Sequence, residues 1–205
     1  MLEQLKNINK DLESLAIPSN IILDKLRVVD EDTRKASAYV DSSYIPFYYY
    51  LGKYVKPKNL LEIGVNLGFF TCAFFKSCRT VENYLAYQED NDEFYSKRLM
   101  LGNIKDNHKN NFDFHYGKFN DTEFLEKIRA KKWDLAFINE EKFYDKYAFV
   151  LDTVWDNLSE NGMLVMENVI SLSASRDAFA NFCKNKNSLI FKTRYGTGIV
   201  AKEEL

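Results

Sequence analysis

The chain has 205 residues, of which 46% are hydrophobic and 28% charged, and this composition predicts one globular domain with a full core. Its formal net charge of −2 gives no basic excess for nucleic acid, and no apolar run approaches the roughly 18 residues that span a membrane. Three cysteines without metal-ligand spacing are expected to be reduced core residues of a cytoplasmic protein. We therefore expect partners other than nucleic acid or membrane.

Two amphipathic helices are predicted ahead of the first strand. Apolar residues recur every three or four positions over residues 2–16 and again over 21–29. A third helix, 44–55, is rich in aromatic residues, which either line an acceptor pocket or pack in the core. We expect one domain over 1–205, with residues 1–43 as an N-terminal helical extension and 44–205 as its core.

Strands and helices alternate along the remainder of the chain. The predicted strands are 60–63, 81–87, 112–116, 133–138, 162–166, 189–193 and 199–202. The predicted helices follow Gly68 and then span 92–101, 122–128, 144–158 and 176–183. Such alternation predicts an α/β fold with a parallel sheet, to which the closing hairpin adds one antiparallel strand.

A glycine turn joins the first strand to the helix behind it. Gly64 and Gly68 bracket the turn, and glycine permits both its geometry and close approach of a ligand. We expect backbone N–H groups freed by this turn, with Glu62 beneath them, to cradle a nucleotide-type ligand at the positive end of the helix dipole.

The pattern Glu62-x-Gly64-x-x-x-Gly68 resembles motif I of the class I S-adenosylmethionine-dependent methyltransferases, with Asn66 in place of a middle glycine. This resemblance implies a Rossmann-like, seven-stranded, mostly parallel sheet and S-adenosylmethionine as cofactor. The cofactor-binding positions that it implies are Glu62, Gly64, Asn66, Gly68, Phe69, Gln88, Glu89, Gly117, Lys118, Phe119 and Asn139.

The acid that holds the cofactor's ribose in that family falls on Gln88, which makes only neutral hydrogen bonds, so Glu89 is the acid that can replace it. Phe119 is expected to stack on the adenine.

Residues 137–144 and 161–169 resemble the catechol and caffeoyl-coenzyme A O-methyltransferase group, and the similarity covers roughly residues 44–202. In that group Mg²⁺ binds the acceptor's oxygens and a lysine takes the hydroxyl proton. The resemblance places the metal ligands at Asn139, Glu167 and Asn168, and the lysine at Lys142. Because one carboxylate replaces two, we expect weak Mg²⁺ binding, with Lys142, or else Glu167 or Glu141, as the base of a metal-free route.

Two functions remain open from the sequence. One is an enzyme that methylates a hydroxyl of a small molecule, such as a sugar or a phenol. The other is a catalytically degenerate relative that acts as a binding or assembly module, in which Lys142 is a solvated loop residue. His115 is expected to be a satisfied strand residue and His108 an exposed loop residue. The N-terminal helices and the many aromatic residues favour a homodimer.

Overall fold

The computed structural model describes residues 2–14, 19–27, 43–90, 97–139, 147–171 and 173–202. Lys142 lies outside the described residues, as do residues 28–42, which include the end of the predicted helix over 21–29. No helix within the described ranges is long and apolar enough to cross a membrane.

A seven-stranded sheet organises the chain, in the order β3-β2-β1-β4-β5-β7-β6. Its strands are β1 (Asn59–Ile63), β2 (Asn83–Glu89), β3 (Phe112–Gly117), β4 (Trp133–Ile138), β5 (Leu158–Glu167), β6 (Asn187–Phe191) and β7 (Thr197–Ala201). Strands β1 to β5 pair in parallel, whereas β7 pairs antiparallel with both β5 and β6. The strand order reverses between β1 and β4, and ligands of open α/β sheets bind at the strands' carboxyl ends at such a point.

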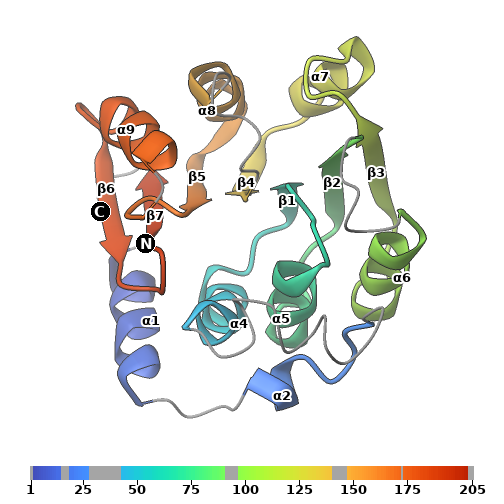
Figure 1. Cartoon of the computed structure of the whole chain (residues 1–205), viewed down its shortest axis with the longest axis horizontal. Coiled ribbons are helices and arrows are strands. Elements are labelled where there is room, and N and C mark those ends of the chain that lie inside the picture. Colours follow the sequence, from blue (N-terminus) through green and yellow to red (C-terminus); the bar gives the residue numbers. More distant parts are fainter. Residues whose placement is uncertain are drawn as a thin grey trace.

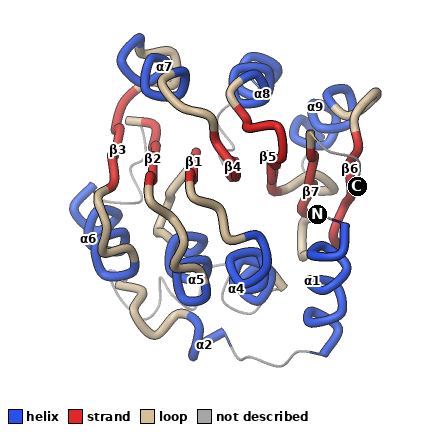
Figure 2. The backbone as a smooth tube through the Cα atoms, turned by 180° about the vertical axis from the view of Figure 1, so that it is seen from behind, coloured by secondary structure: helices blue, strands red, loops and turns tan. Residues whose placement is uncertain are grey.

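Helices cover both faces of the sheet (Figure 1). On one face lie α4 (Tyr44–Val55), α5 (Phe69–Ser77) and α6 (Lys97–Asn107), and on the other α7 (Thr122–Arg129), α8 (Tyr147–Asp156) and α9 (Ser173–Phe182). The view from behind shows α1 (Leu2–Ser14) and α2 (Ser19–Ile22) on the α4–α6 side (Figure 2). This architecture confirms the predicted α/β fold class.

The aromatic residues of α4 belong to the core between that helix layer and the sheet. Phe47 and Tyr48 are fully buried. The Tyr48 ring meets the edges of Phe70 and Phe137 at 5.4 Å, and those two rings stack on each other at 3.8 Å. Burying a side chain of this size stabilises the fold by roughly 1.5–3 kcal/mol. This aromatic stripe therefore fixes α4 against α5 and β4.

Several predicted boundaries are wrong by a few residues. The predicted helix over 21–29 ends at Ile22, because the Leu26 N–H bonds to the Leu23 carbonyl and closes a turn. The second strand begins at Asn83 rather than at residue 81 and continues to Glu89, so Gln88 and Glu89 lie within the strand. The predicted helix over 92–101 starts in residues that lie outside the described part of the chain, and it continues to Asn107 rather than ending at residue 101. Strand β5 begins at residue 158 rather than 162.

Candidate functional site at the carboxyl ends of the strands

The turn between β1 and α5 has left-handed backbone at three positions. Gly64 and Gly68 have φ of 88° and 85°, and Asn66 has φ of 50°. A residue with a Cβ is strained at such angles, although asparagine tolerates them better than most. The glycines are therefore required by the path of the chain, as the sequence pattern indicates.

Four N–H groups of this turn are already donated within the protein. The N–H groups of Gly64 and Val65 bond to the Tyr87 carbonyl at 2.9 and 3.2 Å, that of Asn66 to Gln88 Oε1 at 2.7 Å, and that of Gly68 to the Val65 carbonyl at 2.8 Å. The expectation that the freed amides of Gly64 and Gly68 bind the ligand is therefore wrong. These bonds instead hold the turn in one shape before any ligand arrives.

Polar side chains join three strand ends at the point where the strand order reverses. Asn66 Nδ2 donates to the Asn139 carbonyl at 3.0 Å, and the Asn139 N–H donates to the Ile63 carbonyl at 2.8 Å. Gln88, 1% exposed, reaches the same turn from β2. The structure thus brings Gly64, Asn66, Gln88 and Asn139 together, and Gln88 supports the turn from behind.

Glu62 lies beneath the turn in the core. It is fully buried, accepts a hydrogen bond from Thr71 Oγ1 at 2.9 Å, and accepts another from the Tyr84 hydroxyl. Desolvation raises the pKa of Glu62 to about 8, against the lowering effect of those two bonds. A direct contact between Glu62 and a cofactor is thus a wrong expectation, because this carboxyl ties β1 to α5 and β2.

The ends of β2 and β3 place Glu89 opposite Gly117. The Gly117 carbonyl accepts bonds from the Tyr87 hydroxyl at 3.0 Å and from the Asp90 N–H at 3.2 Å. The exposed Lys118 donates its N–H to Asp121 Oδ2 at 3.0 Å. At this end of the sheet Glu89 is buried, at 8% exposure, whereas Lys118 is exposed.

Phe119 does not flank a ligand at this edge. Its ring is fully buried, with the rings of Tyr87 and Phe149 at 5.6 and 6.0 Å in edge-to-face contacts. The expectation that it stacks on adenine is wrong for this arrangement, because the fully buried ring exposes no face to a ligand. His115 of β3 has Nε2 at 3.2 Å from Asp121 Oδ2, as a satisfied strand residue should.

At the end of β5, Glu167 and Asn168 are buried at 2% and 4% exposure. The Tyr44 hydroxyl donates to Asn168 Oδ1 at 3.2 Å and accepts a bond from the Tyr195 N–H at 3.2 Å. Burial, and then the charge of Glu167, raise the pKa of Tyr44, so its hydroxyl stays a donor. The sequence places Tyr44 among aromatic residues that either line an acceptor pocket or pack in the core, but nothing in its own helix indicates a partner 124 residues away.

The predicted metal ligands fit a divalent cation poorly. β4 and β5 pair as far as Ile138 and Met166, so Asn139 and Glu167 follow at neighbouring strand ends. However, the Asn168 amide oxygen is engaged by Tyr44, and Glu167 is the one carboxylate of the predicted set. Within the described part of the chain, no three His, Cys, Asp or Glu side chains gather as ligands. Hard cations prefer several carboxylate oxygens, so we assign no metal step.

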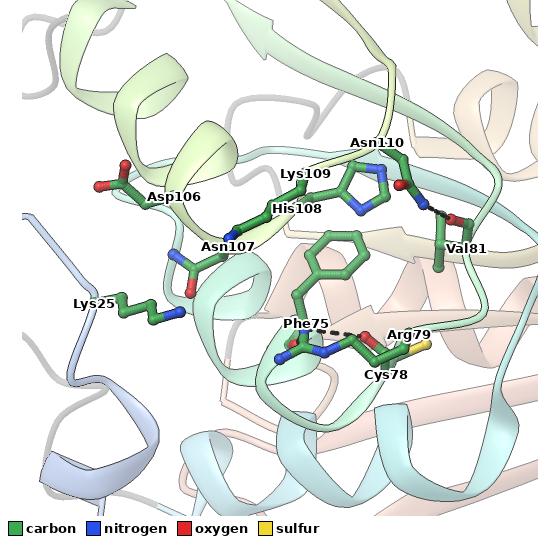
Figure 3. A pocket seen from close by; sticks show the side chains of 10 residues that line it. All are labelled: Lys25, Phe75, Cys78, Arg79, Val81, Asp106, Asn107, His108, Lys109 and Asn110. Carbon is green, nitrogen blue, oxygen red and sulfur yellow. Dashed lines mark hydrogen bonds between the residues drawn. The ribbon is translucent and has the colours of Figure 1, made fainter.

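A cavity of about 340 Å³ lies at the opposite end of the sheet, between the ends of α5 and α6 (Figure 3). His108 lines it at 5% exposure, with its ring 4.4 Å from that of Phe75, so its predicted exposure is wrong. Burial lowers the pKa of His108. Arg79 donates to the Phe75 carbonyl in the last turn of α5, so this cation compensates a helix C-terminus.

The family model that describes a methyltransferase domain matches residues 61–169. Among solved structures, the Bacillus cereus O-methyltransferase in complex with S-adenosylhomocysteine is 15% identical, with a TM-score of 0.67, and the match covers 99% of this chain and 100% of that one. The Streptomyces achromogenes O-methyltransferase TomG, in complex with S-adenosylmethionine, is 14% identical, with a TM-score of 0.65 and coverage of 98% and 99%.

A Staphylococcus aureus protein provisionally assigned as a caffeoyl-CoA O-methyltransferase is 15% identical, with a TM-score of 0.61 and coverage of 99% and 100%. No protein of curated function matches the sequence. At these identities the likeness establishes the fold.

Proposed function

This chain belongs to the methyltransferase domain family, and we propose that it transfers the methyl group of S-adenosylmethionine to the hydroxyl oxygen of a small molecule. Two proteins of the same fold, TomG and the Bacillus cereus enzyme, bind S-adenosylmethionine and S-adenosylhomocysteine respectively. A small acceptor agrees with the net charge of −2, which disfavours a nucleic-acid substrate.

The observation that carries this proposal is the pre-formed glycine turn at the point where the strand order reverses. Asn66 links the ends of β1 and β4, and Gln88 fixes the turn from β2. A site whose backbone is already held in place loses little entropy when a ligand binds. The turn therefore supports cofactor binding through its shape, although four of its amides are used internally.

Five of the predicted residues have proposed roles toward the cofactor. Asn66 and Phe69 would face the amino-acid end of the cofactor, and Glu89 would accept hydrogen bonds from the ribose hydroxyls in place of Gln88. Gly117 and Lys118 would lie beside the adenine. Bound S-adenosylmethionine supplies an electrophilic methyl group on a sulfonium sulfur.

Glu167 is the proposed base among the described residues. A carboxylate beside the acceptor hydroxyl can hold the proton that the hydroxyl gives up. Lys142 remains a second candidate, outside the described residues. Asn168, oriented by Tyr44, would position the acceptor.

The setting of the enzyme is also proposed. Cys72, Cys78 and Cys183 are free thiols, which agrees with a reducing, cytoplasmic compartment.

Leu189 and Ile190 are 37% and 53% exposed on the edge strand β6, which supports a homodimer. We keep one domain over 1–205, because α1 and α2 pack on α4 and add no core of their own.

Calorimetry with S-adenosylhomocysteine tests the cofactor. We expect binding by the wild type and loss of binding in Gly68→Asp, since a Cβ there is strained at φ of 85° and lies 3.2 Å from Asn103 Cβ. Asn185→Asp adds the same charge in an exposed turn and should bind normally. Absence of wild-type binding at millimolar ligand would remove the cofactor from the proposal.

Turnover separates an enzyme from a binding module. Formation of S-adenosylhomocysteine from S-adenosylmethionine, with a panel of phenolic and sugar hydroxyl acceptors, is the expected result. Binding without turnover across the panel would favour the degenerate relative instead.

A further inference from the structure

The segment of residues 19–27, which we call the strap, docks across α5 and α6. Ile22, Leu23 and Leu26 are buried in the core cluster of that helix layer. Figures 1 and 2 both show α2, the start of the strap, on the outer side of this layer. An ion pair between Asp24 and Lys76 at 2.6 Å fastens the strap to α5.

The end of the strap is fastened to α6 through Arg27. Its guanidinium forms a bidentate ion pair with the Asp106 carboxylate, with Nη2 at 2.7 Å from Oδ1. This ion pair is partly exposed, because the Arg27 side chain is 59% exposed, so it contributes little by itself.

The backbone of Arg27 makes the stronger connection, to the side chain of Asn103. The Arg27 N–H donates to Asn103 Oδ1 at 2.7 Å, and Asn103 Nδ2 donates back to the Arg27 carbonyl at 3.0 Å. Asn103 is fully buried in α6. This reciprocal pair fixes the orientation of the side-chain amide.

The same amide also holds the glycine turn. Asn103 Nδ2 donates a second bond, at 2.7 Å, to the carbonyl of Leu67, which lies inside the turn. The absence of a side chain at Gly68 lets Asn103 approach, since a Cβ there would lie 3.2 Å from Asn103 Cβ. One buried side chain therefore contacts both the strap and the turn, and its two donors and its acceptor oxygen are all used.

We propose that Asn103 is a positioning residue that couples docking of the strap to the shape of the cofactor turn. This proposal rests on the proposed function, because it assigns the strap a part in cofactor affinity. When Arg27 leaves Asn103, the amide loses the partners that orient it, and the Leu67 carbonyl loses a fixed donor. Coupling between two sites is reciprocal. The factor by which strap docking raises cofactor affinity is therefore the factor by which bound cofactor favours the docked strap.

A matched pair of variants at the exposed Arg27 tests this coupling. Arg27→Ala removes the ion pair with Asp106 and keeps the backbone bonds to Asn103. Arg27→Pro removes the ion pair and also the N–H that Asn103 Oδ1 accepts. We expect Arg27→Ala to bind S-adenosylhomocysteine within about twofold of the wild type, and Arg27→Pro to bind about tenfold more weakly, as loss of a buried hydrogen bond implies.

Hydrogen exchange measures the coupling directly. In the wild type and in Arg27→Ala, S-adenosylhomocysteine should slow amide exchange in residues 19–27 as well as in 64–68. In Arg27→Pro the slowing of 19–27 should be lost. Equal affinities of the two variants, or unchanged protection of the strap in Arg27→Pro, would overturn the coupling.

The ligand-free protein keeps the two proposals separate. If the wild type binds no S-adenosylhomocysteine, the proposed function fails. The coupling is then judged from exchange without ligand, which should be faster at residues 64–68 in Arg27→Pro than in Arg27→Ala, and equal exchange would refute it. Asn103→Leu, which removes the amide from the other side, should show the same faster exchange as Arg27→Pro.

Discussion

The hydroxyl of Tyr44, at the start of α4, donates a hydrogen bond to Oδ1 of Asn168, at the end of β5, over 3.2 Å. It also accepts the Tyr195 N–H. A single buried hydroxyl thus joins the helix that precedes the sheet to the strand ends proposed to hold the methyl acceptor.

Tyr44→Phe should lower the free energy of unfolding by about 1–2 kcal/mol, because it leaves Asn168 and Tyr195 without this buried partner. Urea unfolding measures the change. Tyr48→Phe is the matched control on the same helix, since the buried Tyr48 hydroxyl has no hydrogen-bond partner in the described structure. Equal destabilisation by the two variants would show that the Tyr44 bonds contribute nothing.

Glu62 should make stability depend on pH. Its pKa is raised from 4.5 to about 8, chiefly by desolvation, so the folded state binds a proton that the unfolded state has lost between those values. The contribution of Glu62 to the free energy of unfolding is therefore largest at low pH and is lost as pH rises through about 8. Between the two pKa values the free energy of unfolding falls by about 1.4 kcal/mol per pH unit. Glu62→Gln should remove this slope.

Urea unfolding between pH 5 and pH 8 gives the free energy of unfolding of the wild type and of Glu62→Gln. The contributions of other titrating groups cancel in the difference between the two proteins. A difference in unfolding free energy that stays constant with pH would mean that Glu62 is ionised in the folded protein.

Gln88→Leu should weaken binding of S-adenosylhomocysteine by about tenfold, because the partly buried Asn66 N–H loses its acceptor and the turn loses its support. Gln88→Glu keeps an acceptor at that place and should retain binding. Calorimetry compares the three proteins. If Gln88→Leu binds like the wild type, the turn does not depend on this bond.

Glu167→Gln should reduce methyl transfer by about a hundredfold and leave S-adenosylhomocysteine affinity within a factor of two, as removal of a general base implies. Glu160→Gln is the control, since Glu160 is an exposed acid of the same strand. Rates of S-adenosylhomocysteine formation decide the matter. Retained activity in Glu167→Gln would leave Lys142 and Glu141 as the candidates.

Local pattern was enough to predict most elements of the fold. Residues 44–55 and 133–138 were predicted at their observed bounds, because a long aromatic run before a proline and a short apolar run between polar residues are both local signals. The glycine positions of the turn were also readable, since left-handed backbone favours glycine.

The parts of the site that depend on distant partners left no such signal. Asn103 binds residues 76 and 36 positions away, and His108 is buried only because Phe75 and Tyr84 pack on it. Motif resemblance likewise places Phe119 and Glu62 beside a ligand, whereas tertiary packing turns both into the core. A sequence pattern specifies which residues can bind, but packing decides which of them face the site.

The placement of β7 has a consequence for shortened chains. In the described sheet, β6 pairs only with β7, which lies between it and β5. A protease cut or premature stop before Thr197 therefore detaches two strands at once and bares the flank of β5 that leads to Glu167. Truncation within this hairpin should yield an aggregating product rather than a smaller folded one.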